Sequence, residues 1–217
     1  MTKIDKNLAN SRKIYKKYEL LESNISDNPM EVFQKWFLEA QEKESGEANA
    51  MNISTIGLDG FPKDRIVLLK RFTWEGFIFY TNYDSEKGKA IANNNKVGIS
   101  FFWQTLERQV IIKGFAEKIA PNLSDGYFES RPEGSRVGAW ASNQSKVIES
   151  REELDKQLKR FQDKFEGKEI LRPKNWGGYI IKPQVIEFWQ GRPNRMHDRI
   201  RFTLQEDYNW LKDRLQP

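Results

Sequence analysis

The chain has 217 residues, of which 38% are hydrophobic and 13% aromatic, enough for one large domain with a substantial core. It has no cysteine and a single histidine, which excludes disulfides and a cysteine nucleophile and argues against a zinc site or any other metal. A formal net charge of +5 favours anionic partners without choosing among them.

No apolar run approaches the ~20 residues of a membrane helix, and the charged residues 1–17 lack the apolar segment of a secretory signal. We therefore expect a cytoplasmic protein without a membrane partner. The positive charges are spread along the chain and form no basic tail, so nucleic acid is not an expected partner either.

The first helix is predicted just after a polar N-terminal segment. Residues 1–27 are polar and charged, and we expect them to form a mobile arm, with residues 28–217 as a single domain. Asn28 and Pro29 suit the cap and first position of a helix, and an apolar stripe from Val32 to Ala40 continues it. The helix should end near Gly46.

Beyond residue 50 the apolar residues mostly follow a period of two, which is typical of strands. Strands are expected at 51–58, 65–70, 77–81, 97–103, 108–119, 177–182, 184–190, 199–204 and 208–214. Helices are expected at 85–94, 122–130 and 150–165. The spacing predicts a mainly β, α+β fold, a largely antiparallel barrel or sandwich with added helices. The glycine-rich signatures of the common nucleotide-binding folds are absent from the sequence.

The single histidine, His197, lies between Arg195 and Arg199. In a strand these three side chains would project to one side. Two permanent cations beside a group with a pKa of ~6.5 suit an anionic or electron-accepting ring. A solvated edge strand with scattered charges is an equally good interpretation of this segment alone.

Two further segments could bind anions. Arg65 and Lys70 flank an apolar strand and could each take a phosphate, or they could be solvated charges at the strand ends. Residues 80–87 run from a strand into a helix start, where backbone N–H groups and Lys87 form a potential anion site. An ordinary capped helix would show the same pattern.

Residues 127–145 contain weaker candidates. Tyr127, Arg131 and Ser135 are four residues apart and would share one face of a helix, as a phosphate clamp would require. Gln144 and Ser145 could hydrogen-bond the amide edge of a heterocycle.

Nine segments together resemble the pyridoxine (pyridoxamine) 5′-phosphate oxidase family, in family order from about residue 28 to the C-terminus. They are Arg65-Ile66-Val67-Leu68-Leu69-Lys70, Phe79-Tyr80-Thr81-Asn82, Thr105-Leu106-Glu107-Arg108-Gln109-Val110, Ser130-Arg131-Pro132, Gly138-Ala139-Trp140, Gln144-Ser145, Trp176-Gly177-Gly178, Ile186-Glu187-Phe188-Trp189-Gln190-Gly191 and His197-Asp198-Arg199. No single segment is specific, but nine in register are.

The resemblance implies an FMN-binding split β-barrel that assembles as a homodimer with both active sites at the subunit interface. The implied reaction converts pyridoxine 5′-phosphate or pyridoxamine 5′-phosphate to pyridoxal 5′-phosphate, with hydride transfer to flavin N5 and reduction of O₂ to H₂O₂. A non-catalytic split-barrel protein that binds flavin or a B6 phosphate is the alternative, and a nucleic-acid-binding β-barrel is a more distant one.

By the same resemblance, one set of residues would bind FMN, with Arg65, Lys87 and Ser145 at its phosphate. The set is Arg65, Ile66, Val67, Leu68, Leu69, Lys70, Tyr80, Thr81, Lys87, Gln109, Gln144, Ser145, Trp189 and Arg199. Substrate would be bound by Arg12, Tyr15, Lys70, Tyr127, Arg131, Ser135, Arg195, Met196 and His197.

Arg195 and His197 are the expected catalytic residues, and we expect His197 to be neutral at pH 7 because its two arginine neighbours disfavour a third positive charge. The sequence departs from the family pattern at two positions. Glu86 stands where many relatives have a basic residue, and Glu47 stands where aspartate is common. Both departures bear on affinity more than on the type of reaction.

Overall fold

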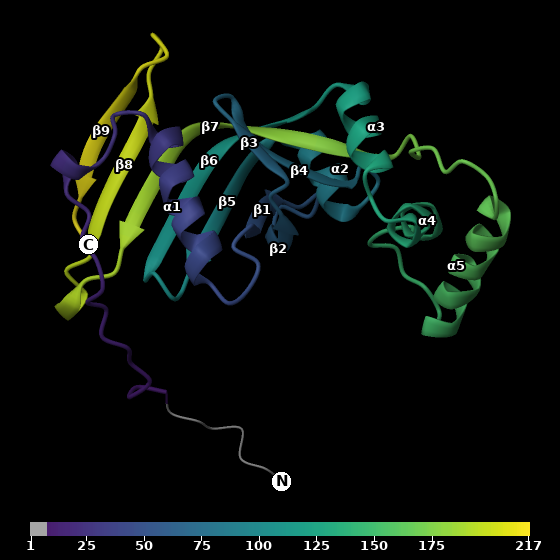
Figure 1. The fold of residues 1–217 in the computed structure, drawn as a ribbon, viewed down its shortest axis with the longest axis horizontal. Helices are drawn as coiled ribbons and strands as arrows, with labels where there is room; N and C mark the ends of the chain where they lie inside the picture. The colour runs from purple at the N-terminus through teal and green to yellow at the C-terminus, as the bar shows by residue number, and fades with distance from the viewer. Residues whose placement is uncertain (1–7) are drawn as a thin grey trace.

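A computed structural model describes residues 8–217, and the strands of this part of the chain form one antiparallel, strongly curled sheet (Figure 1). The strand order is β2-β1-β5-β6-β7-β4-β3, and β8 and β9 extend the sheet from β7. The strands are β1 (Ala50–Ile56), β2 (Pro62–Leu68), β3 (Arg71–Thr73), β4 (Gly76–Asn82), β5 (Lys96–Trp103), β6 (Arg108–Lys118), β7 (Trp176–Gln190), β8 (Asp198–Leu204) and β9 (Trp210–Leu215). The predicted fold class, a mainly β and largely antiparallel fold with added helices, is confirmed.

The long strand β7 organises the sheet. Residues 176–181 pair with β4, residues 185–190 pair with β8, and β6 pairs along nearly its whole length. The sequence predicted two strands here, interrupted near Pro183, and that prediction was wrong. The register of β6 shifts between Lys113 and Gly114, opposite Pro183, and such an irregularity accommodates a proline that cannot donate a ladder hydrogen bond.

Five α-helices and two 3-10 helices accompany the sheet in the described part of the chain. They are η1 (Glu22–Asn24), α1 (Pro29–Lys43), α2 (Glu86–Asn93), α3 (Pro121–Glu129), α4 (Glu133–Ala141), α5 (Arg151–Phe165) and η2 (Pro193–Arg195). The sequence analysis did not predict α4 or the short strand β3. None of the helices formed by the described residues has the length and apolar character to span a membrane.

Helix α1 closes the main core. The Asn28 side chain accepts a hydrogen bond from the Met30 N–H and so caps the helix. The fully buried Phe33 ring meets Phe77 edge-on at 4.8 Å and Phe101 at 5.3 Å between centroids. This aromatic contact fixes the helix across the concave side of the sheet.

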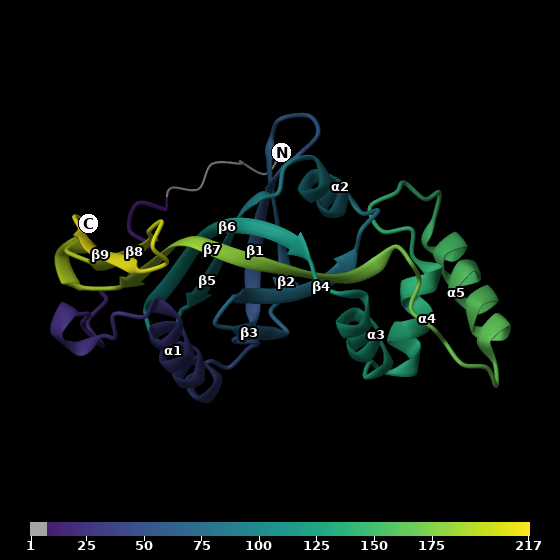
Figure 2. The ribbon, with the colours of Figure 1, turned by 90° about the horizontal axis from the view of Figure 1, so that it is seen from above.

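A second, smaller core joins α3, α4 and α5 around Phe128, Val137, Ile170 and Trp176. Figures 1 and 2 show these three helices at one end of the molecule and the β8–β9 hairpin at the opposite end. The long strand β7 connects the two ends, because it pairs with β4 near the helices and with β8 at the hairpin.

Candidate functional site

A cleft of about 500 Å³ opens where β2 and β4 meet α2 and the α3–α4 pair, within the size range of small-molecule sites. It is lined by Ile66, Val67, Leu68, Lys70, Tyr80, Thr81, Asn82, Lys87, Tyr127, Arg131, Pro132, Ser135, Gln144 and Trp176. Most of these residues were expected from the sequence to bind cofactor or substrate. They come from four segments between residues 66 and 144. Asn82, Pro132 and Trp176 are additions that the structure makes, although each of the three belongs to one of the nine matching segments.

Lys87 is the most buried cation of the cleft, with 7% of the residue exposed. It lies in the first turn of α2, which Ser85 caps by accepting from the Gly88 N–H at 3.2 Å. Its Nζ is 3.3 Å from Thr81 Oγ1 and makes no ion pair with a described residue. Burial, and then the charge of Arg65, lower the pKa of Lys87, while Glu86 opposes them. An anion bound in the cleft would compensate both the burial of the Lys87 charge and its repulsion by Arg65.

One guanidinium nitrogen of Arg131 has no hydrogen-bond partner among the described residues. Its Nη1 is buried and forms no hydrogen bond with the described residues, and burial lowers the pKa of its guanidinium. Its guanidinium carbon lies 4.6 Å above the Trp176 ring. A buried, unsatisfied guanidinium nitrogen is costly, so this residue fits a ligand phosphate as its missing acceptor.

Stacked aromatic rings border the same cleft. Tyr80 stacks on Tyr127 at 3.9 Å between centroids and lies 5.6 Å from Trp176 at an interplanar angle of 11°. Burial, followed by the neighbouring Tyr127, raises the pKa of the Tyr80 phenol. The cleft thus combines flat apolar surfaces with cations, which suits a planar phosphorylated ligand.

The prediction that Tyr127, Arg131 and Ser135 share one face of a single helix was wrong. Helix α3 ends at Glu129 and α4 begins at Glu133, with Pro132 between them, where its ring prevents a continuous helix. All three side chains still line the cleft, because the two helices turn toward it from either side of the break.

A second group of predicted residues surrounds His197. Its ring lies 4.6 Å from Trp189, and its Nδ1 accepts a hydrogen bond from the Arg192 N–H at 3.0 Å. Gln109 and Arg199 pair with Trp189 from the two neighbouring strands. Arg199 also donates to a carboxylate oxygen of Glu187 at 2.7 Å and to the carbonyl of Gln216.

The pKa of His197 is lowered chiefly by burial and secondly by Arg195, while Asp198 opposes them. The expected direction is confirmed, although burial has the larger effect and Arg199 is not among the causes. The hydrogen bond into Nδ1 leaves Nε2 as the protonated nitrogen of the neutral ring.

The prediction that Arg195, His197 and Arg199 project from one strand face was wrong. Strand β8 begins at Asp198, and Arg195 lies in η2 with a φ of 62°. Together with Asn194 at φ 55°, this left-handed backbone turns the chain and cannot belong to a strand. Of the three, only Arg199 is a strand residue.

The remaining proposed residues lie outside the cleft lining. Arg65 is half-buried and donates to Thr55 Oγ1 at 2.7 Å, while Leu69 is buried in the main core. Ser145 lines an adjoining hollow. Arg12 and Met196 are exposed, whereas Tyr15 packs 5.7 Å from Trp189.

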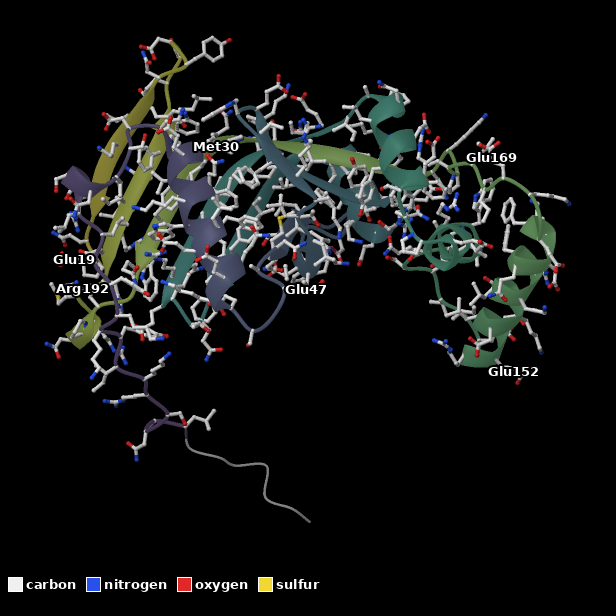
Figure 3. The ribbon with its side chains drawn as sticks, in the orientation of Figure 1. Glu19, Met30, Glu47, Glu152, Glu169 and Arg192 are labelled. Atoms are coloured by element: carbon white, nitrogen blue, oxygen red, sulfur yellow. The ribbon has the colours of Figure 1, made fainter. Side chains whose placement is uncertain are left out.

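The two departures from the family pattern also lie outside it. Glu86 pairs with Lys63, which holds Asp59 at 3.0 Å as well, so its negative charge is balanced locally. Glu47, labelled in Figure 3, lines a separate cavity beside Phe102.

Fold and cleft together define a split-barrel protein with an aromatic, cation-lined binding cleft. A family model described as pyridoxamine 5′-phosphate oxidase matches residues 37–165, and one described as the pyridoxine 5′-phosphate oxidase C-terminal dimerisation region matches residues 176–217. The chain belongs to the pyridoxine/pyridoxamine 5′-phosphate oxidase family. It is therefore an enzyme of the predicted class, an oxidoreductase of this family.

Relatives of this name cover almost the whole chain. The one from Flavobacterium psychrophilum is 64% identical over 98% of this chain and 100% of its own length. The one from Flavobacterium johnsoniae is 60% identical over 96% of this chain and 98% of its own. The family assignment thus extends from the N-terminal segment to the C-terminal hairpin.

Solved structures show the same fold at low identity. PhzG from Burkholderia lata 383, in complex with tetrahydrophenazine-1-carboxylic acid, has a TM-score of 0.83 at 24% identity, covering 91% of this chain and 98% of PhzG. A pyridoxamine 5′-phosphate oxidase-related, FMN-binding protein from Nostoc punctiforme has a TM-score of 0.69 at 13% identity, covering 89% of this chain and 100% of its own.

Proposed function

We propose that this chain oxidises pyridoxine 5′-phosphate or pyridoxamine 5′-phosphate to pyridoxal 5′-phosphate. The observation that supports this most directly is Arg131, whose buried Nη1 has no acceptor in the described part of the chain and lies in a cleft that also contains Lys70 and Lys87. Two phosphorylated ligands, cofactor and substrate, would supply the missing anions. The names of the relatives agree with this reaction.

Cofactor and substrate would divide the cleft between them. Lys87, the helix start of α2 and Arg65 would hold the FMN phosphate, with Ser145 contributing from the adjoining hollow. Tyr127, Arg131 and Ser135 would hold the phosphate of the substrate. When bound, FMN would supply the redox chemistry, as the acceptor at N5 of a hydride from C4′ of the substrate and the donor of two electrons to O₂, which with a proton gives H₂O₂. With the amine substrate, water would supply the aldehyde oxygen and ammonia would leave.

The residues of this chain would orient the reactants and set the local charge. Lys70, Thr81 and Gln144 border the cleft and would donate hydrogen bonds to polar ring atoms. Neutral His197, with its proton on Nε2, would donate to the oxygen or nitrogen on C4′ of the substrate. Arg195 would lie over the pyridine ring and favour its electron-rich form.

The two groups would be brought together by a second copy of the chain. None of the residues around His197 lines the cleft, and β8 and the α3–α5 helices lie at opposite ends of the molecule (Figure 2). The model described as a dimerisation region matches the part of the chain that contains His197. We propose that the cleft of one protomer is completed by residues 195–199 of its partner in a homodimer.

Absorption and turnover test the proposal. The purified protein should be yellow, should release H₂O₂ with either substrate in air, and should lose its flavin colour when substrate is added without oxygen. A colourless protein that gains no activity with added FMN would contradict the proposal. A yellow protein that substrate does not bleach would favour the non-catalytic carrier instead. Cytoplasmic location stays a prediction, checked by fractionation.

A further inference from the structure

The N-terminal segment, residues 13–20, precedes the first long helix and lies beside the His197 end of the sheet, where the purple trace passes β8 and β9 in Figure 1. The Tyr15 ring packs 5.7 Å from Trp189 and 6.0 Å from His197 between centroids. Further along, the Leu20 N–H donates to Asp198 Oδ2 at 3.0 Å. Glu19 forms an ion pair with Arg192 at 3.3 Å, and Figure 3 labels these two residues. The segment is thus attached through Tyr15 and again, a few residues later, through Glu19 and Leu20.

Between these two contacts the segment is held by Glu107, which is 1% exposed. One carboxylate oxygen accepts from the backbone N–H groups of Lys16 at 2.9 Å and Lys17 at 3.1 Å, and the other lies 3.7 Å from Lys13 Nζ. Hydrogen bonds to an ionised carboxylate are stronger than those between neutral groups. A buried carboxylate that holds two backbone groups about 90 residues away is a specific anchor.

The same residue also holds the start of the His197 loop. The carbonyl of Glu107 accepts from the Gly191 N–H at 2.7 Å and from Gln190 Nε2 at 3.1 Å. Its own φ is 56°, a left-handed conformation that lets its side chain and its carbonyl serve different segments. Glu107 thus connects the N-terminal segment to the loop that begins after β7.

Gly191 provides the space that Tyr15 occupies. A Cβ at this position would lie 2.7 to 2.9 Å from Cβ and ring atoms of Tyr15, closer than real Cβ contacts allow. These atoms are near the backbone of Tyr15, so the segment as a whole would have to shift. The position of the segment therefore depends on two features: the hydrogen bonds to Glu107 and the absence of a side chain at Gly191.

We propose that Glu107 is a positioning residue that fastens residues 15–17 over His197 and so closes the substrate end of the active site. This proposal rests on the proposed function for its effect on turnover, but not for the attachment itself. Loss of the anchor should leave the FMN cleft intact, because Glu107 does not line it.

The main test compares three variants of the full-length, FMN-loaded protein. Glu107→Asn keeps a residue that tolerates left-handed backbone but is one carbon too short to reach the segment. Gly191→Ala displaces Tyr15 without touching Glu107. Glu44→Ala is the matched control, because Glu44 accepts from the Thr105 and Leu106 N–H groups in the same turn but does not contact the segment.

Hydrogen exchange of individual backbone amides is the first readout. In Glu107→Asn we expect the Lys16 and Lys17 amides to exchange about ten-fold faster, while the Leu20 amide, held by Asp198, keeps its wild-type rate. Glu44→Ala should leave all three rates unchanged. Unchanged rates for Lys16 and Lys17 in Glu107→Asn, or equal acceleration of all three amides, would overturn the proposal.

Steady-state kinetics are the second readout. Glu107→Asn and Gly191→Ala should each raise KM for pyridoxine 5′-phosphate about ten-fold with unchanged FMN content, and Glu107→Gln should restore part of the loss. An unchanged KM in both variants would overturn the positioning role. If the wild-type protein does not turn over the substrate, the proposed function fails, while the exchange rates still decide whether Glu107 anchors the segment.

Discussion

The surroundings of His197 favour the neutral form of its ring. Burial and the nearby Arg195 lower its pKa from the usual 6.5, so the folded protein takes up this proton less readily than the unfolded chain does. The folded state therefore loses stability as the pH falls below 6.5, and keeps it above that value.

This effect can be measured directly because the chain has one histidine. An NMR titration should give a midpoint below 6.5. In Arg195→Met the midpoint should rise but stay below 6.5, because burial, the larger cause, remains. A wild-type midpoint at or above 6.5 would contradict the neutral, Nε2-protonated ring on which the proposed role of His197 depends.

Arg195 is exposed and lies outside the FMN cleft. Arg195→Met should therefore leave the FMN content at the wild-type level. It should reduce turnover by about 10²-fold, the effect of removing one electrostatic contact to the reacting groups. Lys87→Met serves as the comparison, since it should release FMN. Loss of flavin from Arg195→Met would show that Arg195 binds the cofactor instead.

At the scale of the element, helix α2 positions Lys87 through its cap. The fully buried Ser85 accepts from the Gly88 N–H and donates to the Asn82 carbonyl at 2.6 Å, which joins the helix start to the end of β4. This short link places a cation from the helix and Thr81 from the strand on the same side of the cleft.

Ser85→Ala should cost about 1 to 2 kcal/mol of folding stability, as cap removals do, and should also weaken FMN binding. Ser150→Ala removes the cap of α5, where Ser150 accepts from the Glu153 N–H at an exposed position away from the cleft. It should reduce stability less and leave FMN affinity unchanged. Denaturant unfolding and flavin fluorescence titration measure the two effects, and equal FMN affinity in both variants would argue against the role of the Ser85 cap.

At the scale of the whole molecule, the separation of the cleft from the His197 group makes a prediction about assembly. Arg131→Ala damages the cleft, and Arg195→Met damages the loop at the other end. If each active site combines the cleft of one protomer with the loop of its partner, a mixed dimer contains one intact site and one site with both changes.

Co-expression of the two inactive variants in equal amounts should therefore restore about a quarter of wild-type activity, since random pairing makes half of the dimers mixed and half of their sites intact. Differently tagged copies allow the mixed dimers to be purified and assayed. No recovery in purified mixed dimers would place both groups of a working site in the same protomer. Dimers formed by each variant alone provide the baseline.

The local parts of the fold were readable from the sequence. The start of α1 follows from Asn28 and Pro29, which act within one turn of the helix. The division of residues 127–135 into two helices and the continuity of β7 through Pro183 were not predicted. A proline is tolerated in β7 only because the register of its neighbour β6 shifts opposite it, and that neighbour is about 70 residues away in the chain.

By itself, the sequence identified the family and, through that resemblance, the expected cofactor and the candidate residues, because short motifs contain the residue types that the chemistry needs. The tertiary structure decided which candidates meet. Lys87 and Arg131 share a cleft, while His197 lies at the far end of the molecule beside Tyr15. Such encounters depend on pairing between strands that are distant in the chain, and no local pattern records that pairing.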